Sequence, residues 1–159
     1  MSINNYAKLV LAIVICQLAG VVGSFFTTPS IPTWYASLQK PSFAPPNWLF
    51  APVWITLFTL MGVSTYLVWN KGLQRRDVKT ALFVFGIQLV LNALWSFLFF
   101  GLQSPFFGFI GIVVLWAAIA LTIMSFYRVS KKAGLLLIPY IAWVSIAMIL
   151  NISIWVLNP

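Results

Sequence analysis

Five long apolar runs, separated by shorter polar stretches, dominate this 159-residue chain. Each run is long enough for a helix to cross the ~30 Å hydrocarbon core of a bilayer, which takes about 20 residues. Open strands would leave backbone groups unpaired in lipid, and no run shows the alternation of barrel strands. The pattern therefore predicts an all-α membrane protein with five transmembrane helices in one domain, 1–159. The expected spans are 6–27, 47–70, 79–101, 105–128 and 133–157.

Local signals mark several span boundaries. Asn47 follows two prolines and is expected to cap the second span, and Ser104 followed by Pro105 is expected to cap the fourth. Pro52 and Pro139 fall near the starts of the second and fifth spans. Each removes a backbone hydrogen bond, so we expect a bend near each.

The composition agrees with a lipid-embedded chain. Hydrophobic residues make up 62% of the sequence and charged residues only 6%, whereas soluble domains contain about 25% charged residues. Cys16 is the only cysteine, so no intrachain disulfide can form. An apolar run before a cysteine is typical of a lipoprotein signal, but Ile15 fills the position where such signals carry a small residue. We therefore expect the first span to be retained as a helix.

The net charge of +8 does not indicate a nucleic-acid partner, because the basic residues sit in gaps between the spans. Five crossings place the N-terminus and the second and fourth loops on one side of the membrane. Lys40 is the only basic residue on the other side. Since basic loops stay in the cytoplasm, we expect a cytoplasmic N-terminus and an outside C-terminus. The basic residues on the cytoplasmic side are Lys8, Lys71, Arg75, Arg76, Lys79, Arg128, Lys131 and Lys132.

Most catalytic chemistry lacks its side chains here. The chain has no histidine, and Asp77, in the basic second loop, is its only carboxylate side chain. Carboxylate dyads, Ser-His-Asp triads and histidine metal sites are therefore excluded, and we expect no metal and no obligatory cofactor. Intramembrane proton relays usually need Asp, Glu or His. Their absence, with the absence of an internal repeat, weakens a transporter interpretation.

Three predicted spans each carry a face that mixes aromatic and polar side chains. Because an amide facing lipid is costly, these faces should point into the bundle. They could serve structural packing alone or line a small-molecule pocket, and the combined set favours a pocket in the outer half of the bundle. The faces are Trp54, Phe58, Met61 and Thr65; Gln88, Asn92, Trp95, Ser96 and Phe99; and Tyr140, Trp143, Ala147 and Asn151.

The loop 28–46 lies over that outer half. Its prolines prevent a continuous helix, and its apolar residues Trp34, Tyr35, Leu38 and Phe43 indicate a packed lid rather than disorder. Lys40 is either solvated or a contact for an anionic ligand group. In the first span, small residues recur at every fourth position, which permits close helix approach within the bundle or in a dimer. They are Ala12, Cys16, Gly20 and Ser24.

Three ordered segments resemble the translocator protein family, whose members are also called tryptophan-rich sensory proteins or peripheral-type benzodiazepine receptors. They read WYASLQKPSFAPP from Trp34, QLVLNALWSFLFF from Gln88, and PYIAWVSIAMILN from Pro139. The resemblance implies a five-helix bundle, usually a homodimer, that binds porphyrins such as protoporphyrin and haem. It also implies binding of isoquinoline carboxamides and benzodiazepines.

The resemblance further implies a ligand cavity under the first loop. Trp54 and Asn92 match ligand hydrogen-bond donors of the family, and Trp143 matches a tryptophan implicated in light-dependent protoporphyrin breakdown by some bacterial members. The sequence leaves open whether such breakdown is enzymatic turnover. The segment from Asn151 to Pro159 lacks the sterol-associated motif of animal members, so sterol transport is not expected. The matching cavity positions are Tyr35, Trp54, Phe58, Asn92, Trp95, Ser96, Trp143 and Ala147.

These observations favour a tetrapyrrole-binding receptor or sensor in a prokaryotic plasma membrane, with light-dependent degradation of the ligand as an added activity. Two alternatives stay open. One is a transporter of porphyrins or other amphipathic molecules, which requires directional flux. The other is a membrane scaffold whose aromatic residues only pack, in which case ligands would show no more than partition into lipid.

Overall fold

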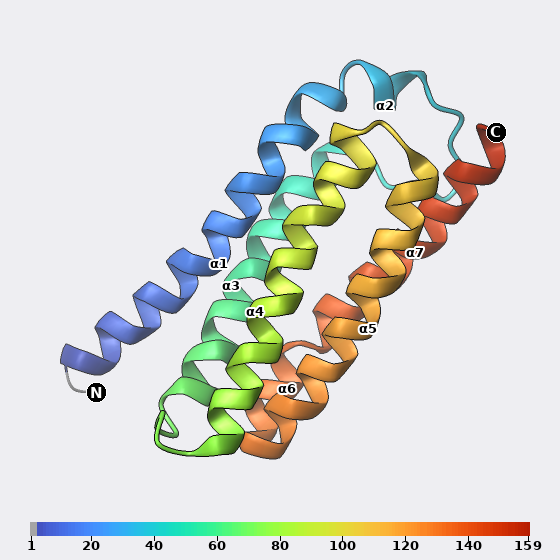
Figure 1. The fold of residues 1–159 in the computed structure, drawn as a ribbon. Helices are drawn as coiled ribbons and strands as arrows, with labels where there is room; N and C mark the ends of the chain where they lie inside the picture. The colour runs from blue at the N-terminus through green and yellow to red at the C-terminus, as the bar shows by residue number, and fades with distance from the viewer. Residues whose placement is uncertain (1–2) are drawn as a thin grey trace.

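Helices make up all the regular secondary structure in residues 3–159, the part of the chain that the computed structural model describes (Figure 1). The first two residues of the predicted 1–159 domain lie outside this range. In chain order the elements are α1 Ile3–Ser30, α2 Trp34–Ser37, the 3₁₀ turn η1 Asn47–Leu49, α3 Phe50–Trp69, α4 Arg76–Ser96, the π-helical turn η2 Phe97–Gly101, α5 Pro105–Val129, α6 Lys131–Leu136 and α7 Ile138–Leu157.

Within residues 3–159, five helical segments are long and apolar enough to cross a membrane, which confirms the predicted five-helix architecture. They are Asn4–Ser30, Asn47–Trp69, Arg76–Gly101, Pro105–Val129 and Lys131–Leu157. The first extends beyond the predicted 6–27 at both ends, because α1 continues through Pro29 to Ser30. Pro29 has no N–H to donate to the carbonyl of Phe25, and the helix ends one residue later.

The fifth span consists of two helices. α6 ends at Leu136 and α7 begins at Ile138, with Pro139 in its first turn. A bend was predicted near this proline, and the structure has a break between two helices there. Pro52 lies in the first turn of α3, directly after η1, so this proline also accompanies a change in helix type.

The two predicted caps differ in outcome. The hydroxyl of Ser104 accepts a hydrogen bond from the backbone N–H of Phe107 at 3.3 Å, so the cap of α5 is confirmed. The predicted cap by Asn47 is wrong. Asn47 is already the first residue of η1, where its carbonyl accepts from the N–H of Phe50 and its side chain makes no capping bond.

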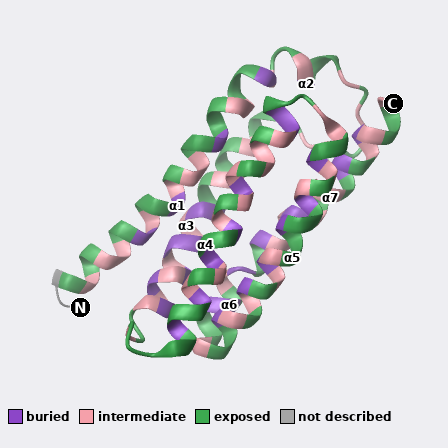
Figure 2. Ribbon diagram, in the orientation of Figure 1, coloured by how far each residue is buried: buried purple, intermediate pink, exposed green. Residues whose placement is uncertain are grey.

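The core lies between the helices, and the outer faces are apolar and exposed, as expected of a bundle in lipid (Figure 2). Helix α1 packs mainly on α3 and α4, and α5 packs on α4, α6 and α7. The largest buried cluster contains Met61, Val68, Ile119, Phe126 and Tyr140. It occupies the part of the bundle farther from α2.

The connection between α1 and η1 lies over the end of the bundle that also holds the C-terminus, where the lid was predicted (Figure 1). Residues 28–30 of the predicted loop 28–46 belong to α1. Tyr35, on the short helix α2, is buried, and Trp34 and Leu38 pack beside it. Phe43 was predicted to be buried as well, but it is 52% exposed. It lies in a turn closed by the Ala44 N–H and the Pro41 carbonyl at 3.0 Å, away from the cluster that buries Tyr35.

The small residues of α1 serve contact within the bundle. Ala12 and Cys16 are buried, and a Cβ added at Gly20 would come within 2.6 Å of Cε2 of Phe58 on α3. Ser24, the last member of this row, is exposed. The row therefore allows α1 to approach α3 closely over most of its length.

Candidate functional site

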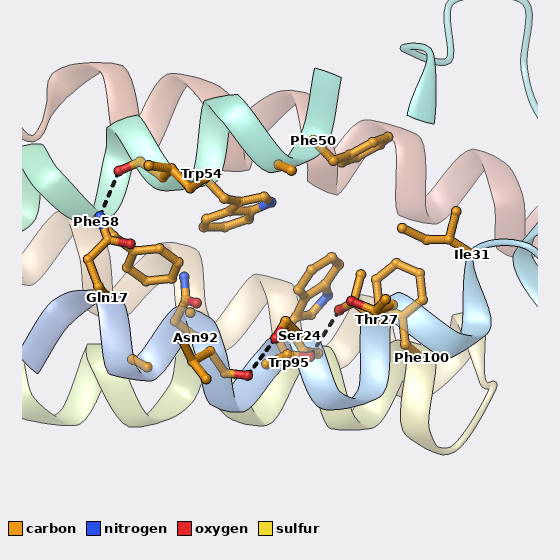
Figure 3. Close-up of a pocket in the computed structure, with 18 of the residues that line it drawn as sticks. Gln17, Ser24, Thr27, Ile31, Phe50, Trp54, Phe58, Asn92, Trp95 and Phe100 are labelled. Carbon is orange, nitrogen blue, oxygen red and sulfur yellow. Dashed lines mark hydrogen bonds between the residues drawn. The ribbon is translucent and has the colours of Figure 1, made fainter. Parts of the chain in front are cut away.

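A cavity of about 320 Å³ lies beneath the lid, between α1, α3 and α4 (Figure 3). This volume is within the range of small-molecule sites, roughly 300–1,000 Å³. Most of its wall is apolar or aromatic, and none of its lining residues is charged. The lining comprises Gln17, Ala19, Gly20, Val21, Gly23, Ser24, Thr27, Thr28, Ile31, Tyr35, Asn47, Phe50, Ala51, Trp54, Ile55, Phe58, Asn92, Trp95, Ser96 and Phe100.

The structure brings six of the eight predicted ligand-binding residues to this cavity and leaves two outside it. The six are Tyr35, Trp54, Phe58, Asn92, Trp95 and Ser96. Ala147 instead lines a second cavity of about 30 Å³ next to the first. Trp143 lines neither and packs edge-on against Phe50, with the ring centroids 6.0 Å apart.

Lys40 also lies outside the cavity lining. Its Nζ is 4.7 Å from the centroid of the Tyr35 ring and donates a hydrogen bond to the carbonyl of Leu38 at 3.2 Å. The cation therefore covers the outer side of a residue that lines the cavity. The positive charge of the lid therefore lies next to Tyr35 and does not line the cavity.

The two buried amides of α4 are held by a tyrosine from α7. Nδ2 of Asn92 donates to Oη of Tyr140 at 2.8 Å, and this hydroxyl donates to Oε1 of Gln88 at 2.9 Å. Gln88 is fully engaged in the core, whereas Asn92 also lines the cavity. Since an amide carries two N–H donors and an acceptor oxygen, Asn92 retains hydrogen-bonding capacity for a ligand.

The two tryptophans that line the cavity offer different groups to a ligand. Nε1 of Trp95 donates to Oδ1 of Asn151 at 3.4 Å, and its ring stacks on Phe99 with centroids 5.6 Å apart. Trp95 therefore offers mainly a ring face. Trp54 packs on Phe58 and edge-on against Tyr140. Within the described residues its Nε1 has no hydrogen-bond acceptor, so this N–H can donate to a ligand.

Tyr35 supplies a further donor from the lid. Its side chain is almost completely buried, and its Oη has no hydrogen-bond partner among the described residues. Burial raises the pKa of Tyr35 above its ordinary value. The phenol is therefore protonated at neutral pH, and its O–H can donate to an acceptor in the cavity.

The wall contributed by α1 was not found from the sequence. Gln17 lines the lower end of the cavity, where its Nε2 donates to the Ile55 carbonyl and to Oγ1 of Thr59, both at 3.0 Å. A Cβ at Gly23 would come within 2.9 Å of Oγ of Ser96. The sequence feature that could have identified this wall was Gln17, because an amide in an apolar span is expected to face a partner inside the bundle, as Asn92 does.

Residues of α1 and α3 that line the cavity are also partly exposed. On these two helices several lining residues are also exposed on the outside of the bundle, among them Val21 at 49% and Ile55 at 58%. Both helices are membrane spans. Part of the cavity wall therefore belongs to the exposed side of the bundle formed by α1 and α3.

Comparison with known proteins finds relatives that match nearly the whole chain. The TspO/MBR family model matches residues 12–156. A tryptophan-rich protein TspO from Chlorobaculum tepidum is 48% identical over 95% of this chain and 96% of its own, and one from Archaeoglobus fulgidus is 47% identical over 97% and 99%. The translocator protein of Bos taurus is 37% identical over 87% of this chain and 83% of its own. The chain belongs to the TspO/MBR family of integral membrane proteins.

Proposed function

We propose that this protein is a membrane receptor or sensor that binds tetrapyrroles such as protoporphyrin and haem in the cavity beneath the lid. The observation that carries the proposal is the cavity itself, whose aromatic walls come from three membrane helices and whose hydrogen-bond donors are few. The same walls suit isoquinoline carboxamides and benzodiazepines, which are also aromatic and mostly apolar.

The chemistry of the walls matches a flat ring system that carries acceptor groups. The rings of Trp54, Phe58 and Trp95 offer surfaces for aromatic packing. Donors come from Trp54, Asn92 and Tyr35. Because no charged residue lines the cavity, the carboxylates of a porphyrin are expected at its rim, near the end of the bundle that carries Lys40.

The exposed part of the cavity wall on α1 and α3 supports uptake from the bilayer. Toward the other end of the bundle, the Gln88–Tyr140–Asn92 hydrogen bonds and the buried cluster around Met61 fill the space below the cavity. This arrangement favours a receptor that holds its ligand in the outer part of the bundle. Transport would require a second, inward-open arrangement of these packed residues.

The proposal includes a cytoplasmic N-terminus in a prokaryotic plasma membrane and assembly as a homodimer. The orientation is supported by the basic residues at one end of the bundle. The dimer is supported by the family resemblance and by the apolar outer faces, although in a bilayer such faces also suit lipid.

A protoporphyrin titration of the purified protein in detergent, followed by tryptophan quenching in the dark, tests the proposal. We expect saturable binding that Asn92→Ala weakens roughly two- to tenfold, since one hydrogen bond is worth roughly 0.5–1.5 kcal/mol. Val90→Ala is the matched control, because Val90 lies on the same helix and is 68% exposed. Quenching that does not saturate, and is equal for both variants and wild type, would mean that the porphyrin only dissolves in the micelle.

Illumination of the same samples tests light-dependent breakdown. If Trp143 takes part in the photochemistry, porphyrin loss should slow in Trp143→Phe while dark binding stays saturable. Trp155→Phe is the control, because Trp155 packs on Phe106 and Phe109 and lines neither cavity. Equal rates of loss in both variants and wild type would assign the photochemistry to the porphyrin alone.

A further inference from the structure

The main cavity and the smaller second cavity are separated by aromatic side chains. Four residues line both: Tyr35, Phe50, Trp95 and Phe100. The volumes on the two sides are about 320 Å³ and about 30 Å³. A ligand in the main cavity therefore reaches the neighbourhood of Ala147 only if one of these shared side chains moves.

Phe50 is the least constrained of the four. Tyr35 and Phe100 are buried, and Trp95 is held by its stacking on Phe99 and its hydrogen bond to Asn151. Phe50 is only half-buried. It is the first residue of α3, directly after the lid and the 3₁₀ turn, and its ring makes edge contacts with Tyr35 at 6.5 Å and Trp143 at 6.0 Å.

Two buried donors lie against Phe50 without an acceptor. Nε1 of Trp143 and Oη of Tyr35 have no hydrogen-bond partner among the described residues. Buried polar groups are normally paired, and an unpaired one can mark the place of a missing ligand atom. Both donors belong to rings that pack edge-on against Phe50. Tyr35 already lines the main cavity, whereas Trp143 lines neither cavity, so displacement of Phe50 would open the main cavity toward the ring of Trp143.

We propose that the side chain of Phe50 is a movable partition that sets the size of ligand the protein accepts. A ligand confined to the main cavity leaves it in place. A larger flat ligand with a carboxylate or carbonyl acceptor displaces it, joins the two cavities and accepts a hydrogen bond from Nε1 of Trp143. The identity of the large ligand as a tetrapyrrole rests on the proposed function, whereas the partition itself does not.

The partition can be tested without a tetrapyrrole by fluorine NMR of protein labelled with fluorotryptophan, titrated with isoquinoline as a small probe. In wild type we expect isoquinoline to shift the resonances of Trp54 and Trp95 but not that of Trp143. In Phe50→Ala all three should shift saturably. The exposed Trp48, at 72%, reports probe that partitions into the micelle.

Ile31→Ala is the matched control, because Ile31 lines the main cavity only and its truncation leaves the partition intact. It should leave the Trp143 resonance unshifted by isoquinoline. If Phe50→Ala fails to fold, Phe50→Leu provides a smaller but still apolar side chain and a partial effect. Equal shifts of Trp143 in wild type and in the Phe50 variants, or no shift in any folded Phe50 variant, would overturn the partition.

Protoporphyrin binding to variants of Phe50 and Trp143 then tests whether the partition limits the size of the ligand. Trp143→Phe should weaken protoporphyrin binding several-fold in an otherwise wild-type protein. In a Phe50→Trp background, where a larger ring blocks the passage, binding should be weaker and Trp143→Phe should add nothing, a coupling measured by a double-mutant cycle. Additive effects of the two changes would contradict the size limit. Absence of any saturable protoporphyrin binding would instead defeat the proposed function and leave the isoquinoline result standing.

Discussion

Single glycines control how closely α1 and α3 approach beside the cavity. A Cβ added at Gly62 would lie 2.5 Å from Cα of Ile13, which is backbone and cannot rotate away. At Gly20 the obstacle is the ring of Phe58, a side chain of the cavity wall. Gly86, on α4, has no atom within 4 Å of an added Cβ. The same residue type therefore has different importance at each position.

We predict that Gly62→Ala destabilises the protein by roughly 1–3 kcal/mol, because the added methyl group overpacks a backbone contact between two helices. Gly86→Ala is the control and should cause no loss, since its Cβ enters open space and alanine is the better helix former. Thermal unfolding in detergent, followed by a cysteine-reactive dye that reports exposure of the buried Cys16, measures both. Equal midpoints for the two variants would contradict the close approach of α1 and α3.

At the scale of elements, the lid is tied to the end of α7. The side chain of Asn158 accepts a hydrogen bond from the N–H of Gln39 and donates one to the Gln39 carbonyl, both at 3.0 Å. The same amide donates to the carbonyl of Ile154 at 2.8 Å. One side chain thus links the lid to the C-terminal turn of a helix 119 residues away in sequence.

We predict that Asn158→Ala loosens the lid without unfolding the bundle. Loss of two hydrogen bonds should speed amide exchange of Gln39 and its neighbours by roughly tenfold, since each bond contributes about 0.5–1.5 kcal/mol. Hydrogen–deuterium exchange with mass spectrometry measures this. Ser153→Ala is the control, because Oγ of Ser153 bonds only the Ile149 carbonyl of its own helix. Unchanged exchange in the lid of Asn158→Ala would show that other contacts hold it.

At the scale of the whole molecule, the two ends of the bundle differ in charge. The α3–α4 loop and the α5–α6 junction lie at one end, and the lid and C-terminus lie at the other (Figure 1). Lys8 belongs to the first group, because its Nζ lies 5.9 Å from the ring of Trp69 at the end of α3. The structure therefore gathers the basic residues other than Lys40 at the end opposite the cavity, which suits a cytoplasmic position for that end.

We predict that Gln74→Cys reacts with a membrane-impermeant maleimide only after the cells are permeabilised, whereas Ser42→Cys reacts in intact cells. Both side chains are exposed, one in the α3–α4 loop and the other in the lid. The native Cys16 is buried, so the unsubstituted protein provides a low background. The reverse pattern of labelling would invert the proposed orientation, and labelling of both positions in intact cells would indicate dual insertion.

The sequence by itself determined the architecture, because the requirement to satisfy backbone groups in lipid leaves little choice for long apolar runs. It also located the lid, the Ser104 cap and the disturbance of the fifth span near Pro139, which depend on local chemistry. It placed Gln88, Asn92 and Tyr140 on inward faces, since helical periodicity assigns a face to each residue.

Only the tertiary structure decided which faces meet. Helical periodicity does not predict that Tyr140 bonds both amides of α4, or that Gln17 and Gly23 complete the cavity wall. Nor does it predict that Trp143 packs on Phe50 outside the lining of the main cavity. These features depend on the order in which helices pack and on how closely they approach. The link between Asn158 and Gln39 likewise exists only because the fold brings the C-terminal end of α7 beside the lid.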